Sequence, residues 1–144
     1  MKDNYFIDTN IFIYTFDLKD DFKREKAKEI VKTALIDGKG FISTQVIQEF
    51  YNVATRKFKS PMNILSAKKY LENIFAQLNI VHPDFKFISN GLDIAATTKY
   101  SFYDSLIISA ALKSGSSVLL TEDMHHGHRI QGLEIKNPFY ATLP

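Results

Sequence analysis

Short apolar runs alternate with longer stretches of helical periodicity along the chain, and this alternation constrains the fold more than any other feature. Residues 5–7, 41–43, 80–81 and 117–120 have the composition of short buried strands. Stretches of ten or more residues with amphipathic spacing separate most of these runs, as expected for helices that connect parallel strands. The pattern therefore predicts an α/β domain whose central sheet is mostly parallel and covered by helices on both faces.

Capping residues and helix breakers divide the longer stretches into separate helices. Asp20 and Asp21 begin the first of them, where acids suit the positive end of the helix dipole. Gly38 follows its last residues, and Thr44 is the predicted N-cap of the next helix. We expect helices over residues 20–36, 44–58, 63–78, 84–98 and 103–113, a short helix or turn over 11–15, and a short last strand over 133–135.

Length and composition limit the number of domains and the chemistry. The chain has 144 residues, the usual size of one domain, so we expect a single domain over residues 1–144. The absence of cysteine excludes a disulfide framework, a thiolate nucleophile and a cysteine zinc site. The sequence shows no signal peptide and no apolar run long enough for a membrane span, so we expect a cytoplasmic protein. A net charge of +2 permits a nucleic-acid partner without requiring one.

Four acidic residues stand where α/β proteins bind ligands or where an apolar face would exclude charge. Asp8 and Asp123 each follow a strand, and the carboxyl ends of parallel strands share one edge of the sheet. Glu49 and Asp104 interrupt apolar helix faces, where an uncompensated carboxylate is costly. Neither helix has a Lys or Arg in its first turn. The set therefore predicts a site for a divalent cation, and its oxygen ligands favour Mg²⁺ or Mn²⁺ over zinc.

The motifs that hold these acids resemble those of a known ribonuclease family. Asp8-Thr9-Asn10 comes first, Glu49 follows in residues 45–50, and residues 103–107 and 119–123 contain the last two acids. In order and spacing they resemble the PIN-domain ribonucleases, above all the VapC-type toxins of toxin–antitoxin pairs. The resemblance extends over essentially the whole chain, although the single Glu49 is a weak motif by itself.

The resemblance implies both a fold and an activity. The implied fold is a single PIN domain, a three-layer α/β/α sandwich with a sheet of about five short strands. The implied activity is that of a Mg²⁺-dependent endoribonuclease, with Mn²⁺ as an alternative metal, which hydrolyses RNA phosphodiester bonds as the toxin of a type II toxin–antitoxin system. The implied partners are an RNA substrate, a small cognate antitoxin that covers the acidic pocket, and a second copy in a homodimer.

Each member of the site has an expected role and a simpler alternative. We expect Asp8, Asp104 and Asp123 to hold the metal, and Glu49 to complete the site or to help deprotonate the attacking water. Asn10 and Thr121 would support these ligands. The alternatives are structural: Asp8 and Asn10 also suit helix caps, Asp104 a first helical turn, Asp123 a turn, and Glu49 a solvated boundary.

Several residues outside the four acids have both a functional and a structural interpretation. The sequence leaves open whether Glu122 or one of His125, His126 and His128 assists Asp123, although a solvated loop is favoured for all of them. Arg129 is the better single candidate for a phosphate contact. Arg56 ends the helix of Glu49, where it suits either an RNA-binding rim or the negative end of the helix dipole.

Two other functions fit an α/β domain with acids at the sheet edge. One is a non-catalytic PIN-fold module that binds RNA or protein, which an incomplete acid set would indicate. The other is a phosphate-receiving switch, which needs a lysine close to the acids after the last strand. Lys136 lies too far from residues 121–123 along the chain to support that second alternative.

Overall fold

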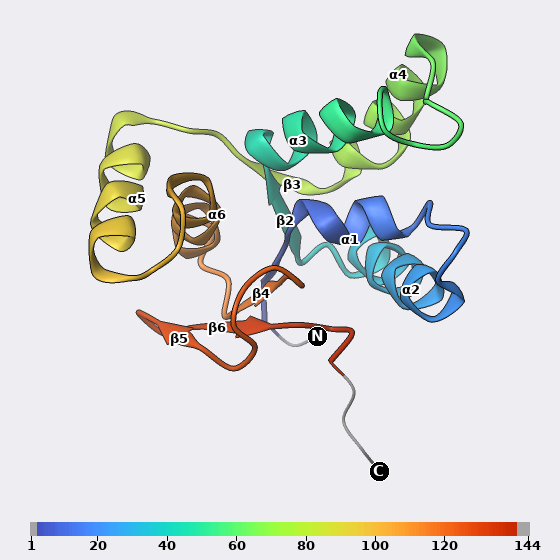
Figure 1. Ribbon diagram of the computed structural model, residues 1–144. Helices are drawn as coiled ribbons and strands as arrows, with labels where there is room; N and C mark the ends of the chain where they lie inside the picture. The colour runs from blue at the N-terminus through green and yellow to red at the C-terminus, as the bar shows by residue number, and fades with distance from the viewer. Residues whose placement is uncertain (1–2, 141–144) are drawn as a thin grey trace.

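The computed structural model describes residues 3–140 and contains a six-stranded sheet in the order β3-β2-β1-β4-β6-β5 (Figure 1). Neighbouring strands are parallel except β5, which runs antiparallel to β6 at the edge. The predicted mostly parallel sheet is confirmed, with one strand more than expected because β5 has only two residues and leaves no sequence pattern. The strands are β1 (Tyr5–Ile7), β2 (Gly40–Ser43), β3 (Asn79–Val81), β4 (Val118–Leu120), β5 (Arg129–Ile130) and β6 (Leu133–Lys136).

Helices cover both faces of the sheet (Figure 1). On one side α6 (Phe102–Lys113) packs against β2 and β4, and α5 (Phe85–Thr97) packs against α6. On the other side lie α1 (Thr9–Tyr14) and α2 (Asp21–Asp37), with α3 (Thr44–Ala54) against α1. α4 (Ile64–Asn73) and the 3₁₀ turn η1 (Phe75–Gln77) complete this end of the molecule. No helix in the described part of the chain is long and apolar enough to cross a membrane.

Two helices end earlier than the sequence predicts, and one begins with a different cap. α3 ends at Ala54 and not near residue 58, and the N–H of Arg56 then bonds to the carbonyl of Val53, three residues back, as in a turn. The predicted helix over 63–78 stops at residue 73, and a separate 3₁₀ turn follows it. Ser43, not Thr44, caps α3: its Oγ accepts from the N–H of Val46 at 3.4 Å.

The core forms on both faces of β1, whose residues Tyr5, Phe6 and Ile7 are all buried. Aromatic rings join the outer helices to this core: the ring of Phe50 on α3 stacks on that of Tyr70 on α4 with centroids 5.0 Å apart. β2 begins with a glycine because its neighbour α2 leaves no room for a side chain. A Cβ at Gly40 would lie 2.6 Å from the Cβ of Ala34.

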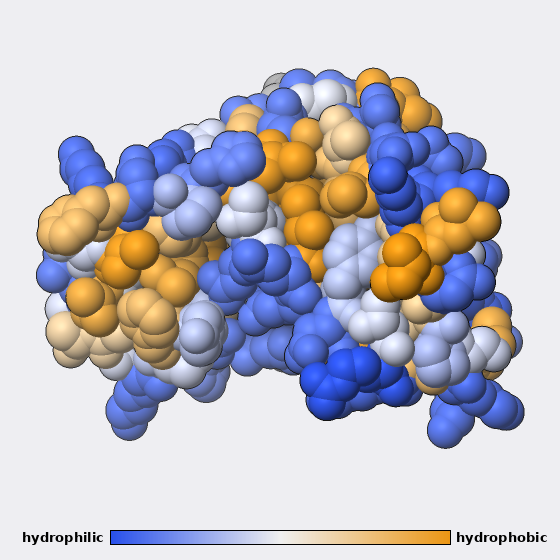
Figure 2. All heavy atoms as spheres, turned by 90° about the horizontal axis from the view of Figure 1, so that it is seen from above, coloured by the Kyte–Doolittle hydropathy of each residue, from blue (hydrophilic) through white to orange (hydrophobic). Residues whose placement is uncertain are grey.

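Several large apolar side chains remain on the surface. On α5, Phe85, Ile88 and Leu92 are exposed, and their spacing of three and four residues places them on one side of the helix. Seen from above, hydrophobic residues gather in separate areas with hydrophilic residues between them (Figure 2). Exposed apolar stripes of this kind are typical of surfaces that protein partners cover.

The strand register determines where the functional side chains lie. Ile7, the last residue of β1, pairs with Leu120, the last residue of β4. The residues that follow, Asp8 and Thr121, therefore leave the sheet side by side, and the N–H of Asp8 donates to the carbonyl of Leu120 at 3.0 Å. Parallel pairing thus brings the first and last sequence motifs together at one edge.

Candidate active site

Asp8 is the most deeply buried acid of the site, with 5% of its surface exposed. Its carboxylate caps α1 by accepting from the N–H of Thr9 at 2.7 Å, and it also accepts from the hydroxyl of Thr121 at 2.8 Å. The pKa of Asp8 is raised to about 7, chiefly by burial and also by the nearby carboxylates of Glu49 and Asp123, against the lowering effect of the two hydrogen bonds. The Asp8 carboxylate therefore caps α1 and also lies near two other acids of the predicted set.

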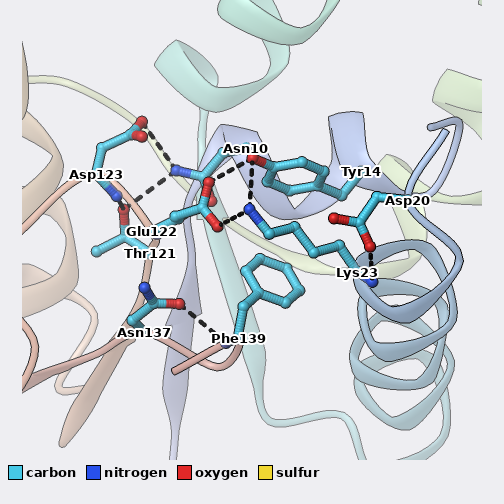
Figure 3. Close-up of polar contacts among 9 residues, drawn as sticks. All are labelled: Asn10, Tyr14, Asp20, Lys23, Thr121, Glu122, Asp123, Asn137 and Phe139. Carbon is cyan, nitrogen blue, oxygen red and sulfur yellow. Dashed lines mark hydrogen bonds and ion pairs between the residues drawn. The ribbon is translucent and has the colours of Figure 1, made fainter. Parts of the chain in front are cut away.

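Asn10 links the first motif to the last one through its side-chain amide (Figure 3). Its Nδ2 donates to Asp123 Oδ2 at 3.0 Å and to Thr121 Oγ1 at 3.2 Å. Its Oδ1 accepts from the N–H of Glu122 at 3.3 Å. Asn10 does not cap α1; its hydrogen bonds hold the 121–123 turn beside Asp8, and the supporting role expected of Asn10 and Thr121 stays a prediction.

Glu49 enters the site from α3 and is half-buried. Its Oε1 accepts from the hydroxyl of Thr9 at 2.7 Å, and its Oε2 accepts from Gln45 Nε2 at 3.3 Å. The same Gln45 amide also donates to the carbonyl of Tyr103 at 3.1 Å, which joins α3 to the start of α6. These contacts fix the Glu49 carboxylate toward α1 instead of leaving it in open solvent.

Asp104 lies in the first turn of α6, which Ser101 caps by accepting from the Asp104 N–H at 3.1 Å. The rest of that helix is buried from Ser105 to Ala111, as its apolar sequence predicts. Burial raises the pKa of the Asp104 carboxyl, and the charges of Asp123 and Glu49 raise it as well. The charges of Glu49 and Asp123 thus lie close enough to raise the pKa of both Asp8 and Asp104.

The four carboxylates carry negative charge without a protein cation to balance it. Within residues 3–140, none of them forms an ion pair. As placed, no three acidic or histidine side chains of these residues are close enough together to hold a metal ion between them. The donor chemistry nevertheless fits Mg²⁺ or Mn²⁺: every donor is oxygen, and the buried Asp8 lacks a counter-charge that a hard cation would supply.

The comparison with known proteins agrees with the motifs that hold these acids. A model of the PIN domain family matches residues 5–129. The chain belongs to the PIN domain family. Comparison with curated proteins finds no significant match.

Solved structures similar to this PIN domain include several toxins. A toxin–antitoxin complex from Klebsiella pneumoniae matches with a TM-score of 0.71 at 18% identity, covering 94% of this chain and 98% of that one. The sarcin–ricin-loop-cleaving toxin VapC20 of Mycobacterium tuberculosis matches with a TM-score of 0.64 at 17% identity, covering 83% and 90%. FitAcB of Neisseria gonorrhoeae matches with a TM-score of 0.65 at 18% identity, covering 95% and 99%. At these identities the likeness concerns the fold alone.

Glu122 is placed differently from its neighbour Asp123 in this PIN domain. Its carboxylate accepts from the hydroxyl of Tyr14 and forms an ion pair with Lys23 at 2.6 Å (Figure 3). It contacts neither Asp8 nor Asp123 through its side chain. The Glu122 side chain is therefore neither a solvated loop acid nor part of the carboxylate cluster.

The three histidines after the last motif are engaged with aromatic residues. His128 Nδ1 lies 3.0 Å from the hydroxyl of Tyr100, and the ring of His126 stacks on that of Tyr140 with centroids 4.2 Å apart. His126 Nδ1 also accepts from the N–H of Asn137 at 3.0 Å. All three are exposed, and these contacts favour a structural loop over a role in assisting Asp123.

The two arginines predicted to contact phosphate lie apart from the acids. Arg129 is on β5, paired in register with Glu134, which in turn pairs with Val118 at the amino end of β4. The acids lie at the opposite, carboxyl ends of the strands, and Arg129 forms an ion pair with Glu134 at 3.3 Å. Arg56 is exposed beyond the end of α3, bonded to Asn52 at 3.0 Å. Neither placement supports a phosphate contact, which remains a prediction.

Sequence reasoning missed four side chains that shape the site. Thr9 stands inside the first motif, and Gln45 precedes Glu49 by one helical turn, so both had a local signal in motif position or spacing. Tyr14 and Lys23 reach Glu122 from more than 90 positions away. No local pattern marks such partners, because only tertiary packing brings them together.

Proposed function

We propose that this PIN domain is a Mg²⁺- or Mn²⁺-dependent endoribonuclease and the toxin of a type II toxin–antitoxin system. The observation that carries the proposal is the gathering of Asp8, Glu49, Asp104 and Asp123 at one end of the sheet, where none of them forms an ion pair within residues 3–140. A carboxylate as buried as Asp8 is costly unless a counter-charge meets it. A buried carboxylate does not help a hydrophobic core to pack, whereas a metal site requires one.

Three acids would hold the metal, and one would move a proton. We assign Asp8, Asp104 and Asp123 to the metal, which when bound lowers the pKa of water and neutralises charge on a phosphodiester. Glu49 takes the proton of the attacking water at Oε2, which accepts only the longer bond of 3.3 Å from Gln45, whereas Oε1 accepts the bond of 2.7 Å from Thr9. Asn10 and Thr121 orient Asp123 and Asp8 through the hydrogen bonds they already make.

The proposal extends to partners and to domain organisation. A small antitoxin is supported by the similarity to the Klebsiella pneumoniae complex, and an RNA substrate by the similarity to a toxin that cleaves the sarcin–ricin loop. The exposed stripe of Phe85, Ile88 and Leu92 provides apolar surface for a protein partner, including a second copy in a homodimer. We further propose that residues 1–144 form one domain.

Cleavage of RNA by the purified chain tests the activity. We expect cleavage with Mg²⁺ or Mn²⁺ and none with EDTA, and a loss of at least about a hundredfold in Asp8→Asn and Asp104→Asn. Asp93→Asn is the matched control, because Asp93 is an exposed acid on α5 and is not one of the four acids of the site. Induction in a growing bacterium adds the toxin readout: the parent and Asp93→Asn should arrest growth, and Asp8→Asn should not.

The same assay separates the alternative function. A non-catalytic module would bind RNA with equal affinity in the parent and in Asp8→Asn, and neither would cleave it. Parent-level cleavage in Asp8→Asn or Asp104→Asn with Mg²⁺ present would show that the acids have been assigned wrongly.

A further inference from the structure

Glu122 lies between Thr121 and Asp123 in the last motif, and its side chain turns toward α2 (Figure 3). Its Oε2 is 2.6 Å from Nζ of Lys23, and its Oε1 accepts from the hydroxyl of Tyr14. Lys23 Nζ also donates to that hydroxyl at 3.4 Å. The three groups form a closed set of polar contacts at the side of the acidic site.

Lys23 is held in place by aromatic rings as well as by charge. Its Nζ lies 4.8 Å from the ring centroid of Tyr14 and 5.7 Å from that of Phe139. The two rings meet edge to face with centroids 5.1 Å apart. A lysine enclosed in this way has few other conformations, so it can fix the position of the carboxylate that it binds.

Holding Glu122 in place also holds Asp123, because the two residues share one backbone turn and one partner. The N–H of Glu122 donates to Asn10 Oδ1 at 3.3 Å, and Asn10 Nδ2 donates to Asp123 Oδ2 at 3.0 Å. If the Glu122 side chain swung free, the turn could rotate away from Asn10. The path from Lys23 to the Asp123 carboxylate is therefore continuous through covalent and hydrogen bonds.

We propose that Lys23 is a positioning residue of the acidic site. It binds Glu122, keeps that carboxylate out of the cluster, and thereby fixes the 121–123 turn so that Asp123 faces Asp8. Its use in metal binding rests on the proposed function, whereas its effect on the turn does not. A partly exposed ion pair contributes little to global stability, so the main effect of Lys23 is local.

Two possible roles of Lys23, as a nearby positive charge or as a residue that positions Asp123, predict opposite effects of its removal on metal binding. Removing a cation near an acidic cluster strengthens the attraction of the cluster for Mn²⁺ if only charge matters. If Lys23 positions Asp123, its removal weakens Mn²⁺ binding despite the gain in negative charge. Whether removal of Lys23 strengthens or weakens Mn²⁺ binding therefore shows which of the two roles it has.

Lys23→Met tests the proposal, with two comparison variants. Lys23→Arg keeps the charge and the ion pair, and Lys28→Met removes the same charge from an exposed position on the same helix. Amide hydrogen exchange in the metal-free protein should be about tenfold faster at Glu122 and Asp123 in Lys23→Met only. Titration calorimetry should show Mn²⁺ binding weakened about 10- to 100-fold in Lys23→Met, and near the parent value in the other two.

Two results would overturn the positioning role: unchanged exchange at Glu122 and Asp123 in a folded Lys23→Met, or Mn²⁺ binding as tight as or tighter than the parent's. If the parent itself binds no Mn²⁺, the metal-dependent function fails, and the exchange measurement alone still decides whether Lys23 holds the turn. Circular dichroism of each variant establishes that the fold is retained, and Lys23→Arg supplies a folded comparison if Lys23→Met does not fold.

Discussion

The hydroxyl of Thr121 donates a hydrogen bond to the carboxylate of Asp8, with 2.8 Å between Oγ1 and Oδ2, across 113 positions of sequence. The same Oγ1 accepts from Asn10 Nδ2 and from the N–H of Asp123, at 3.2 Å each. One buried oxygen thus connects the first and last motifs of the site. Thr121 has no exposed surface, so water cannot replace these bonds.

Replacing Thr121 should therefore damage the site more than its size suggests. Thr121→Val keeps the shape but removes one hydrogen bond each from the Asp8 carboxylate, the Asn10 amide and the Asp123 N–H. We expect a loss of about 1–3 kcal/mol in the free energy of unfolding, and Mn²⁺ binding weakened about 10- to 100-fold. Thr121→Ser keeps the hydroxyl and should bind Mn²⁺ nearly as the parent does. Equal binding by the Val and Ser variants would rule out this role for the hydroxyl.

The metal-free protein should lose stability as the pH rises toward 7. The pKa of Asp8 is raised from 3.8 to about 7 in the folded state. Between about pH 4 and pH 7 the unfolded chain releases this proton while the folded chain keeps it, so the free energy of unfolding falls. For this group alone the fall is about 4 kcal/mol, since each pKa unit corresponds to about 1.4 kcal/mol. Urea unfolding in EDTA at several pH values measures it.

Asp8→Asn should remove most of that pH dependence. At pH 8 we expect the metal-free variant to be about 1–3 kcal/mol more stable than the parent, because relief of a buried charge exceeds the loss of one hydrogen bond. The difference should reverse by pH 4, where the parent carboxyl is neutral, and the variant should be about 1–3 kcal/mol less stable there. If the free energy of unfolding changed equally with pH in the parent and in Asp8→Asn between pH 4 and pH 8, the raised pKa of Asp8 would be contradicted.

Metal binding should release a proton and stabilise the fold. Mn²⁺ requires the ionised form of Asp8, so its affinity should rise about tenfold per pH unit between pH 5 and 7. At one hundred times its dissociation constant, the ion should add about 2.7 kcal/mol to the free energy of unfolding. Calorimetry in buffers of different ionisation enthalpy counts the proton, and Asp8→Asn should show neither effect. Binding without proton release near pH 6 would argue against Asp8 as a ligand.

Gly40→Ala should destabilise the protein without affecting the acids directly. The added Cβ would lie 2.6 Å from the Cβ of Ala34, which has no rotamer to move away. We expect a loss of about 1–3 kcal/mol from overpacking. Combining it with Ala34→Gly should cost less than the sum of the two single changes. If the losses of stability of Gly40→Ala and Ala34→Gly simply add in thermal unfolding, the close contact with Ala34 is not the reason that residue 40 is a glycine.

The local patterns of the sequence were sufficient to predict the architecture. The apolar run of residues 5–7 predicts a buried strand because nothing polar interrupts it, and Gly38 predicts the end of a helix because its left-handed conformation, at a φ of 70°, suits glycine. Helix ends were less predictable: residues 55–58 have helical composition, but α3 ends at Ala54 and a turn follows, in which the Arg56 N–H bonds to the carbonyl of Val53. The strand Arg129–Ile130 was missed because two residues carry no periodicity.

By itself the sequence determined which residues could form the acidic site, because Asp8, Asp104 and Asp123 stand at the ends of strands or the start of a helix and Glu49 interrupts an apolar helix face. Only the tertiary structure decided how each acid is held. Parallel pairing of β1 with β4 placed Thr121 on Asp8, and the docking of α2 placed Lys23 on Glu122. Such partners depend on the register of strands and the packing of helices. These are long-range properties that no short stretch of sequence encodes.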